Sequence, residues 1–210
     1  MNGNNGILIP DKKLVYFYIP KCACTSLKAF LARHLKLKFI DPHAAPFDYI
    51  PPSRVADYHG WTSFALVRHP LDRLVSLYRD KIRPGYRGWG FKAGVEQFVF
   101  GKYQGFHEKM SFEQFATMCM DIPPGSSDYH FAPQWGQISH DGEPAVQHLF
   151  KMENMEPFLA FLTDRGLNVE TLYHSNPTKR MGPWEDRYTS ELRERAVEYY
   201  RDDMKQFGYD

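Results

Sequence analysis

Residues 14–35 read LVYFYIPKCACTSLKAFLARHL, and this stretch decides the fold class. Its opening run, Leu14 to Ile19, is continuously apolar and of strand length, which is typical of a parallel strand covered on both faces. From Thr25 onward, apolar residues recur at helical spacing and the charged residues lie on the other face. The stretch therefore predicts a buried strand, a short loop and a helix.

The same order of elements returns later in the chain. A short apolar strand is expected at 64–67, and a helix is expected from Pro70, whose missing N–H donor costs nothing in a first turn. Further elements are expected in the second half: a helix from Ser111, a strand at 145–150, and helices at 157–165 and 190–204. This alternation predicts an α/β three-layer sandwich with a central, mostly parallel sheet and helices on both faces. We expect a single domain over 1–210, with a glycine- and aromatic-rich insertion around 84–110 as a lid over an acceptor site.

Composition excludes several classes of function. The chain has 26 Lys and Arg against 25 Asp and Glu, and a net charge of +1 gives no general attraction to nucleic acid or to an anionic membrane. The three cysteines, Cys22, Cys24 and Cys119, do not suit a secreted disulfide framework. Residues 1–11 lack the pattern of a secretory leader, and no stretch is long and apolar enough to cross a bilayer. We expect a cytoplasmic protein with no nucleic-acid partner and no transmembrane segment.

The loop before the first helix has the features of an anion site. Lys21 would add a full positive charge to the positive end of the helix dipole, where backbone donors face outward. The backbone N–H donors are those of Cys22, Ala23, Cys24, Thr25 and Ser26, and the side chains of Thr25 and Ser26 add two hydroxyl groups. The G-x-x-x-x-G-K-[ST] pattern of the common nucleotide loop is missing, which argues against a kinase. The alternative for this loop alone is a capped helix beside a solvated lysine, and we expect its two cysteines to fill the loop and not to bind a metal.

A second basic segment follows the strand expected at 64–67. Arg68 would leave the strand end, while Arg73 and Ser76 are three residues apart and so share a face of the next helix. A guanidinium fork and a hydroxyl suit a phosphate monoester, which accepts several charge-assisted hydrogen bonds. The alternative is an arginine that pairs with Asp72 on a polar helix face.

Both segments resemble motifs of one enzyme family, the sulfotransferases that use 3′-phosphoadenosine 5′-phosphosulfate (PAPS). The loop is similar to their 5′-phosphosulfate motif, P-K-x-x-x-T-S, and the second segment to their 3′-phosphate motif, R-x-P-x-x-R-x-x-S-x-Y. Residues 67–76 are especially similar to the Golgi carbohydrate sulfotransferases that include the chondroitin 4-O and uronyl 2-O branches. The resemblance continues in order at 130–134, 151–154, 176–179 and 203–209. This chain shows no membrane anchor, stem or luminal cysteines like those of the Golgi enzymes, so we expect a compact relative; the alternative is the luminal domain of such an enzyme.

The resemblance implies a P-loop nucleotide-hydrolase-like fold and a transfer of the sulfuryl group from PAPS to a hydroxyl, with release of 3′,5′-ADP. It implies that Lys21 holds the bridging and 5′-phosphate oxygens and that Arg68 and Ser76 hold the 3′-phosphate. Lys179 and Arg180, in a late loop, would close over the same phosphate. No metal is required, and the acceptor is expected to be a carbohydrate.

An alcohol needs a general base, and histidine is the commonest choice. The candidates are His59, just before the second strand, and His130, in a segment that resembles the 4-O branch. Two alternatives to a sulfotransferase stay open: a nucleotide kinase on the same architecture, and a protein that binds PAPS or 3′,5′-ADP without catalysis. The sequence does not indicate the oligomeric state.

Overall fold

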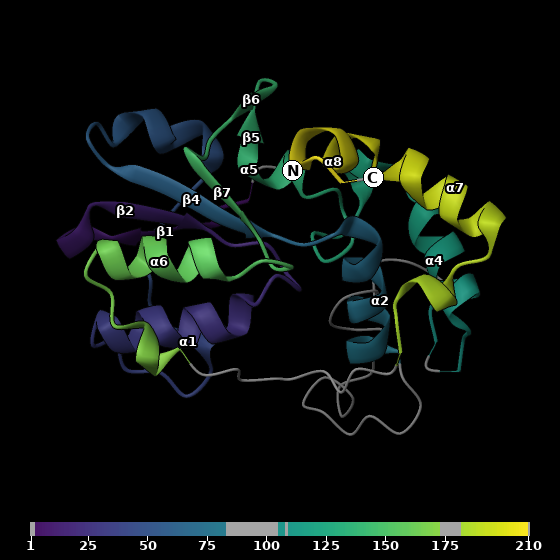
Figure 1. Ribbon diagram of the computed structural model, residues 1–210, viewed down its shortest axis with the longest axis horizontal. Helices are drawn as coiled ribbons and strands as arrows, with labels where there is room; N and C mark the ends of the chain where they lie inside the picture. Colours follow the sequence, from purple (N-terminus) through teal and green to yellow (C-terminus); the bar gives the residue numbers. More distant parts are fainter. Residues whose placement is uncertain (1–2, 83–104, 108, 173–181, 210) are drawn as a thin grey trace. The chain divides into compact units, whose positions relative to one another are not determined.

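The computed structural model of the protein describes residues 3–82, 105–107, 109–172 and 182–209. The chain divides into two compact units, each with its own apolar core (Figure 1). Unit 1 comprises Met1–Arg68 and Gln134–Pro177, and unit 2 comprises His69–Pro133 and Thr178–Asp210. The lid predicted around 84–110 falls almost entirely outside the described residues.

Unit 1 is built on a five-stranded sheet in the order β3-β1-β2-β4-β7. Its strands are β1 (Gly6–Ile9), β2 (Leu14–Phe17), β3 (Tyr49–Ile50), β4 (Thr62–Val67) and β7 (His148–Lys151). β2, β4 and β7 pair in parallel, whereas β1 is antiparallel to both β2 and β3, so four of the five strands run in one direction. The sheet is mostly parallel, as predicted, but β1 and β3 were not predicted. A separate hairpin, β5 (Ser139–His140) with β6 (Glu143–Pro144), follows the short helix α5 (Trp135–Ile138).

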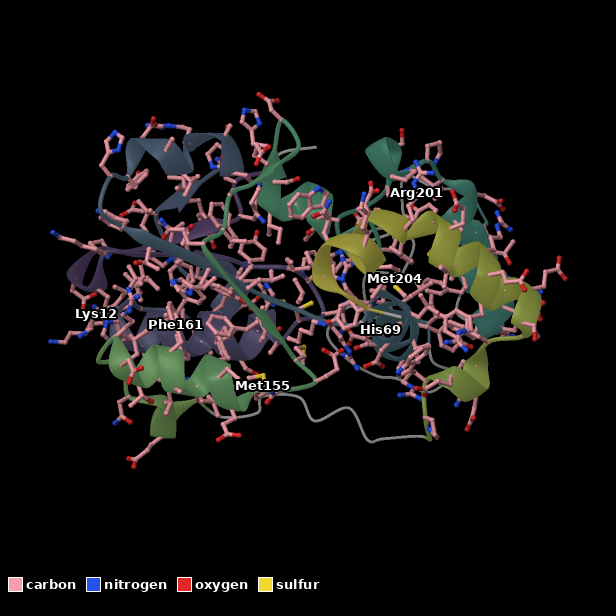
Figure 2. The ribbon with its side chains drawn as sticks, turned by 45° about the horizontal axis from the view of Figure 1, so that its top comes forward. Lys12, His69, Met155, Phe161, Arg201 and Met204 are labelled. Atoms are coloured by element: carbon pink, nitrogen blue, oxygen red, sulfur yellow. The ribbon has the colours of Figure 1, made fainter. Side chains whose placement is uncertain are left out.

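One face of this sheet is covered by helices. All four residues of β2 are fully buried, and Tyr16 stacks on Phe64 of β4 with ring centroids 5.2 Å apart. Two helices, α1 (Cys24–His34) and α6 (Glu156–Asp164), pack on the same cluster of core residues (Figure 1). Phe161 of α6, labelled in Figure 2, contacts Phe64 and Phe150 with centroid distances of 5.2 and 5.1 Å. The continuous apolar run of β2 is therefore explained by its central place in the sheet.

The opposite face is covered differently. Val15 and Ser63 point to this face, where they line a cavity together with residues of the 3-10 segment η3 (Pro52–Asp57) and of 144–147. Both longer α-helices of unit 1 lie on the first face. The predicted three-layer sandwich, with its P-loop nucleotide-hydrolase-like form, is therefore not confirmed within this unit, because η3 and residues 144–147 line the face where a second helical layer was expected.

Unit 2 consists of helices and turns in its described residues. Four α-helices contribute to it: α2 (Pro70–Lys81), α4 (Phe112–Asp121), α7 (Ser190–Tyr199) and α8 (Arg201–Phe207). The predicted capping box is confirmed, because the Gln114 N–H donates to the Ser111 hydroxyl at 3.2 Å and the Ser111 N–H to the Gln114 amide oxygen at 2.8 Å. The single helix predicted at 190–204 is in fact two, which meet at Tyr200. In the part of the chain that the structure describes, no helix is long and apolar enough to span a membrane.

Candidate functional site

The loop between β2 and α1, residues 18–23, turns through two residues in the left-handed region of backbone space. Lys21 and Ala23 have φ angles of 69° and 54°. This conformation costs a non-glycine residue about 1–2 kcal/mol. Ala23 is the N-cap of α1, and no described side chain caps the helix there. The first turn of α1 therefore keeps its backbone donors at the positive end of the helix dipole without a side-chain cap.

A buried glutamine joins this β2–α1 loop to the end of β4. Gln134 has no exposed surface, and its amide oxygen accepts from the Arg68 N–H at 3.1 Å and from the Cys22 thiol at 3.3 Å. Its amide nitrogen donates to the Arg68 carbonyl at 2.8 Å. The Arg68 guanidinium also donates to the Lys21 carbonyl at 3.5 Å. The structure thus brings Lys21 and Arg68 together at the edge of the sheet where the parallel strands β2 and β4 both end.

His59 lies at the opposite end of β4. It precedes Thr62, the first residue of a strand that ends at Val67, and a strand of that length spans about 20 Å. His59 lines the cavity of about 330 Å³ on the second face of the sheet, together with Tyr58 and Trp61. The structure therefore does not bring His59 together with Lys21 and Arg68.

His130 lies in unit 2, in a loop of residues 128–133 that we call the His130 loop. Its Nδ1 is 2.7 Å from the Asp128 carboxylate, which also accepts from the His130 backbone N–H at 2.9 Å. The His130 side chain is 18% exposed, so the ring is held but still open to solvent. A carboxylate at Nδ1 favours the tautomer with its proton there, which leaves Nε2 as a proton acceptor. This is the arrangement of an oriented general base.

Buried donors fix the backbone of the His130 loop. Arg73 is only 1% exposed, and its guanidinium donates to the carbonyls of Tyr129 and Ala132, both at 2.8 Å. The Tyr200 hydroxyl donates to the Phe131 carbonyl at 2.7 Å. Arg73 was predicted to contact a phosphate, but these contacts give its guanidinium a place inside unit 2, beside the loop that carries the histidine.

The remaining predicted residues are distributed as follows. Ser76 is buried on α2. His69, labelled in Figure 2, is the N-cap of that helix, where its Nδ1 accepts from the Leu71 N–H at 3.3 Å. Arg68 belongs to unit 1 and Ser76 to unit 2. Lys179 and Arg180 lie outside the described residues.

Two residues of interest were not predicted as site residues. Asp128 could have been noticed because it stands two residues before His130, and Gln134 because it closes the segment that resembles the 4-O branch. Cys22, Cys24 and Cys119 are buried, and burial raises the pKa of the Cys119 thiol well above its ordinary value. The described residues contain no group of three or more His, Cys, Asp or Glu that could hold a metal ion.

Known proteins similar to this chain were found at the level of a family and of individual relatives. The profile of the Sulfotransferase family matches residues 5–210. The chain is 23% identical to carbohydrate sulfotransferase 12 of Xenopus laevis, over 97% of this chain and 60% of that protein. It is 24% identical to carbohydrate sulfotransferase 14 of Mus musculus, over 68% of this chain and 40% of that protein. It is also 31% identical to carbohydrate sulfotransferase 11 of Rattus norvegicus, over 36% of this chain and 26% of that protein. The chain thus spans less than two thirds of the length of each of these relatives, and no solved structure matches it.

Proposed function

Because the chain belongs to the sulfotransferase family, we propose that it transfers the sulfuryl group of PAPS to a hydroxyl of a carbohydrate, with release of 3′,5′-ADP. The observation that carries this proposal is the contact between the Arg68 guanidinium and the Lys21 carbonyl at the ends of β4 and β2. This contact places the guanidinium of Arg68 beside the backbone of Lys21 at the carboxyl ends of parallel strands, and two cationic residues at such a place suit a donor with several anionic groups. The names of the relatives, all carbohydrate sulfotransferases, support a carbohydrate acceptor.

On the donor side, the Lys21 ammonium and the N–H groups of Cys22 to Ser26 would hold the phosphosulfate. Arg68 and Ser76 would hold the 3′-phosphate, and Lys179 and Arg180 would close over it. The acceptor oxygen attacks sulfur, the bond from sulfur to the bridging oxygen breaks, and its electron pair leaves with 3′,5′-ADP. Lys21 would stabilise the negative charge that develops on that oxygen, and electrostatic stabilisation of developing charge is usually the largest single contribution to catalysis.

On the acceptor side, His130 would remove the hydroxyl proton through Nε2. Its contact with Asp128 supports this role, because an oriented imidazole with a carboxylate at Nδ1 is stabilised when it becomes positively charged. His59 is left out of the proposed site because it lies at the far end of β4 from Lys21. The cytoplasmic location expected from the sequence has no support from the relatives, and both it and the luminal alternative stay predictions.

Labelled PAPS, offered with a panel of glycans, phenols and lipids, tests the proposal directly. We expect label to appear on a glycan together with a stoichiometric amount of 3′,5′-ADP. Calorimetry should show binding of 3′,5′-ADP that is tighter than binding of ATP with magnesium, because only the former carries a 3′-phosphate. Preference for ATP would indicate a kinase, and binding of 3′,5′-ADP without transfer to any acceptor would indicate a binding protein.

A further inference from the structure

The Gln134 side chain lies beside Arg68, the residue that follows the end of β4. The β2–β4 ladder ends with Phe17 opposite Ala65, two residues before Val67. Just beyond β4, the Gln134 side chain pairs with both backbone groups of Arg68: its oxygen accepts from the N–H and its nitrogen donates to the carbonyl. A side-chain amide therefore makes the two hydrogen bonds that a neighbouring strand makes in a ladder.

The same amide oxygen also reaches the β2–α1 loop. It accepts from the Cys22 thiol, and both Cys22 and Gln134 are fully buried. Cys22 lies between the two left-handed residues, Lys21 and Ala23, so its side chain is fixed in the part of the loop where the chain turns most sharply. No described side chain caps α1 at Ala23, so the Cys22 contact holds the loop just before the helix begins.

From these contacts we infer that Gln134 is a positioning residue that sets the spacing between Lys21 and Arg68, and so the fit of the donor. The inference rests on the proposed function, because it assigns Gln134 a role in binding PAPS and 3′,5′-ADP. Gln134 does not touch the donor in this account. It acts through the backbone of Arg68 and through the Cys22 side chain, which are held by three hydrogen bonds from one rigid amide.

The chain offers a matched control at the other end of the same strand. The Gln147 amide oxygen accepts from the Ser63 N–H at 3.1 Å, so this glutamine also pairs with the backbone of β4. Gln147 lies at the amino end of β4, away from Lys21 and Arg68, and has no part in the proposed chemistry. Gln147→Met removes a glutamine contact near the start of β4, whereas Gln134→Met removes one to the residue that follows its end, at the proposed donor site.

The experiment measures the Kd for 3′,5′-ADP and the steady-state constants of the full chain below its unfolding temperature. For Gln134→Met we expect kcat/KM for PAPS to fall about tenfold to a hundredfold, as displacement of binding groups by about 1 Å does. The Kd for 3′,5′-ADP should rise, and the KM for the acceptor should stay unchanged. Gln147→Met should leave all three constants at the wild-type values. A Gln134→Met protein that binds 3′,5′-ADP as wild type does would overturn the inference.

A second pair of variants decides the matter if Gln134→Met does not fold. Cys22→Ala removes the thiol donor to the Gln134 oxygen and should weaken binding of 3′,5′-ADP severalfold, whereas Cys22→Ser keeps a donor at that position and should bind 3′,5′-ADP more tightly than Cys22→Ala does. Equal affinity in these two variants would count against the inference. If the wild-type chain itself binds no 3′,5′-ADP, the proposed function fails, and the inference fails with it. If the wild-type chain binds 3′,5′-ADP and the variants bind it with the same Kd, only the inference fails.

Discussion

The β2–α1 loop and the His130 loop differ in the groups that are proposed to act: backbone donors in the first and a side chain in the second. In the β2–α1 loop the proposed binding groups are mostly backbone donors, the turn is made by two left-handed residues, and one buried amide from outside the loop anchors it. In the His130 loop the proposed reactive group is a side chain, and buried donors take the carbonyls of Tyr129, Phe131 and Ala132. Backbone N–H groups must stay uncovered to bind an anion, so the first loop is held through a thiol and a carbonyl. A base needs a fixed ring, and the second loop is held through three of its carbonyls.

The largest effect is expected at the β2–α1 loop. Lys21→Ala should lower kcat by about 10³, because the cation that stabilises the leaving oxygen is removed. Lys13→Ala is a matched control, since Lys13 is also a left-handed lysine, with φ of 50°, and lies before β2. Sulfate-transfer assays of both variants measure the difference. Full activity in Lys21→Ala would mean that this loop does not carry the donor chemistry.

A smaller effect on activity is expected in the His130 loop. Asp128→Asn keeps the shape of the side chain but weakens the orientation and charge stabilisation of the imidazole. We expect kcat to fall by about 10²–10³ with little change in the KM for PAPS. Asp121→Asn, which changes an exposed partner of Arg195, should have no effect on turnover. An unchanged kcat in Asp128→Asn would contradict the proposal that His130, oriented by Asp128, is the general base.

The cross-links of the His130 loop should be visible in stability. Arg73→Met takes the charged donor of a buried guanidinium away from the Tyr129 and Ala132 carbonyls, and we expect the free energy of unfolding to fall by about 3 kcal/mol. Arg201→Met removes an exposed pair with Glu198 and should change it by less than about 0.5 kcal/mol. Urea denaturation followed by circular dichroism compares the two. Equal stability would show that the buried guanidinium does not hold the loop.

Tyr200 gives the same region a pH dependence. Burial raises the pKa of its hydroxyl well above the ordinary value, so the folded chain keeps this proton to a higher pH than the unfolded chain does. Its contribution to stability is complete below about pH 10 and is lost as the pH rises above that value. Tyr200→Phe should be about 1 kcal/mol less stable at neutral pH and should lose less stability between pH 9 and 11, measured by thermal unfolding. An identical alkaline loss in both proteins would contradict this.

The smallest effect is expected from the strained turn. Ala23→Gly relieves the left-handed conformation and should raise the free energy of unfolding by about 0.5 kcal/mol. Ala29→Gly, inside α1, should lower it by about 1 kcal/mol. Denaturant midpoints of the two variants should therefore move in opposite directions, and a loss in both would mean that the turn is not strained.

Local patterns predicted much of the fold, because strand, loop and helix are each specified by residues close in sequence. The β2–α1 unit, the start of α2 and the capping box at Ser111 are of this kind. Gln134 is different, since its partners Cys22 and Arg68 lie 112 and 66 positions away, and no periodicity reports such a contact. Arg73 was predicted as a ligand residue from its spacing with Ser76, and that role stays a prediction; spacing does not report that its guanidinium donates to the Tyr129 and Ala132 carbonyls. β1 was not predicted, because it pairs antiparallel with β2 and so is not part of the repeated order of strand, loop and helix.

The shared direction of β2 and β4 has a consequence for how this protein can change. Every residue proposed to hold the donor in unit 1 follows a strand end, and none projects from the middle of a strand. Substitutions in the rings between the sheet and its helices, such as the stacked pair of Tyr16 and Phe64, should therefore leave the proposed donor groups in place when they keep the same volume. The core residues and the proposed donor groups at the strand ends can therefore be changed separately.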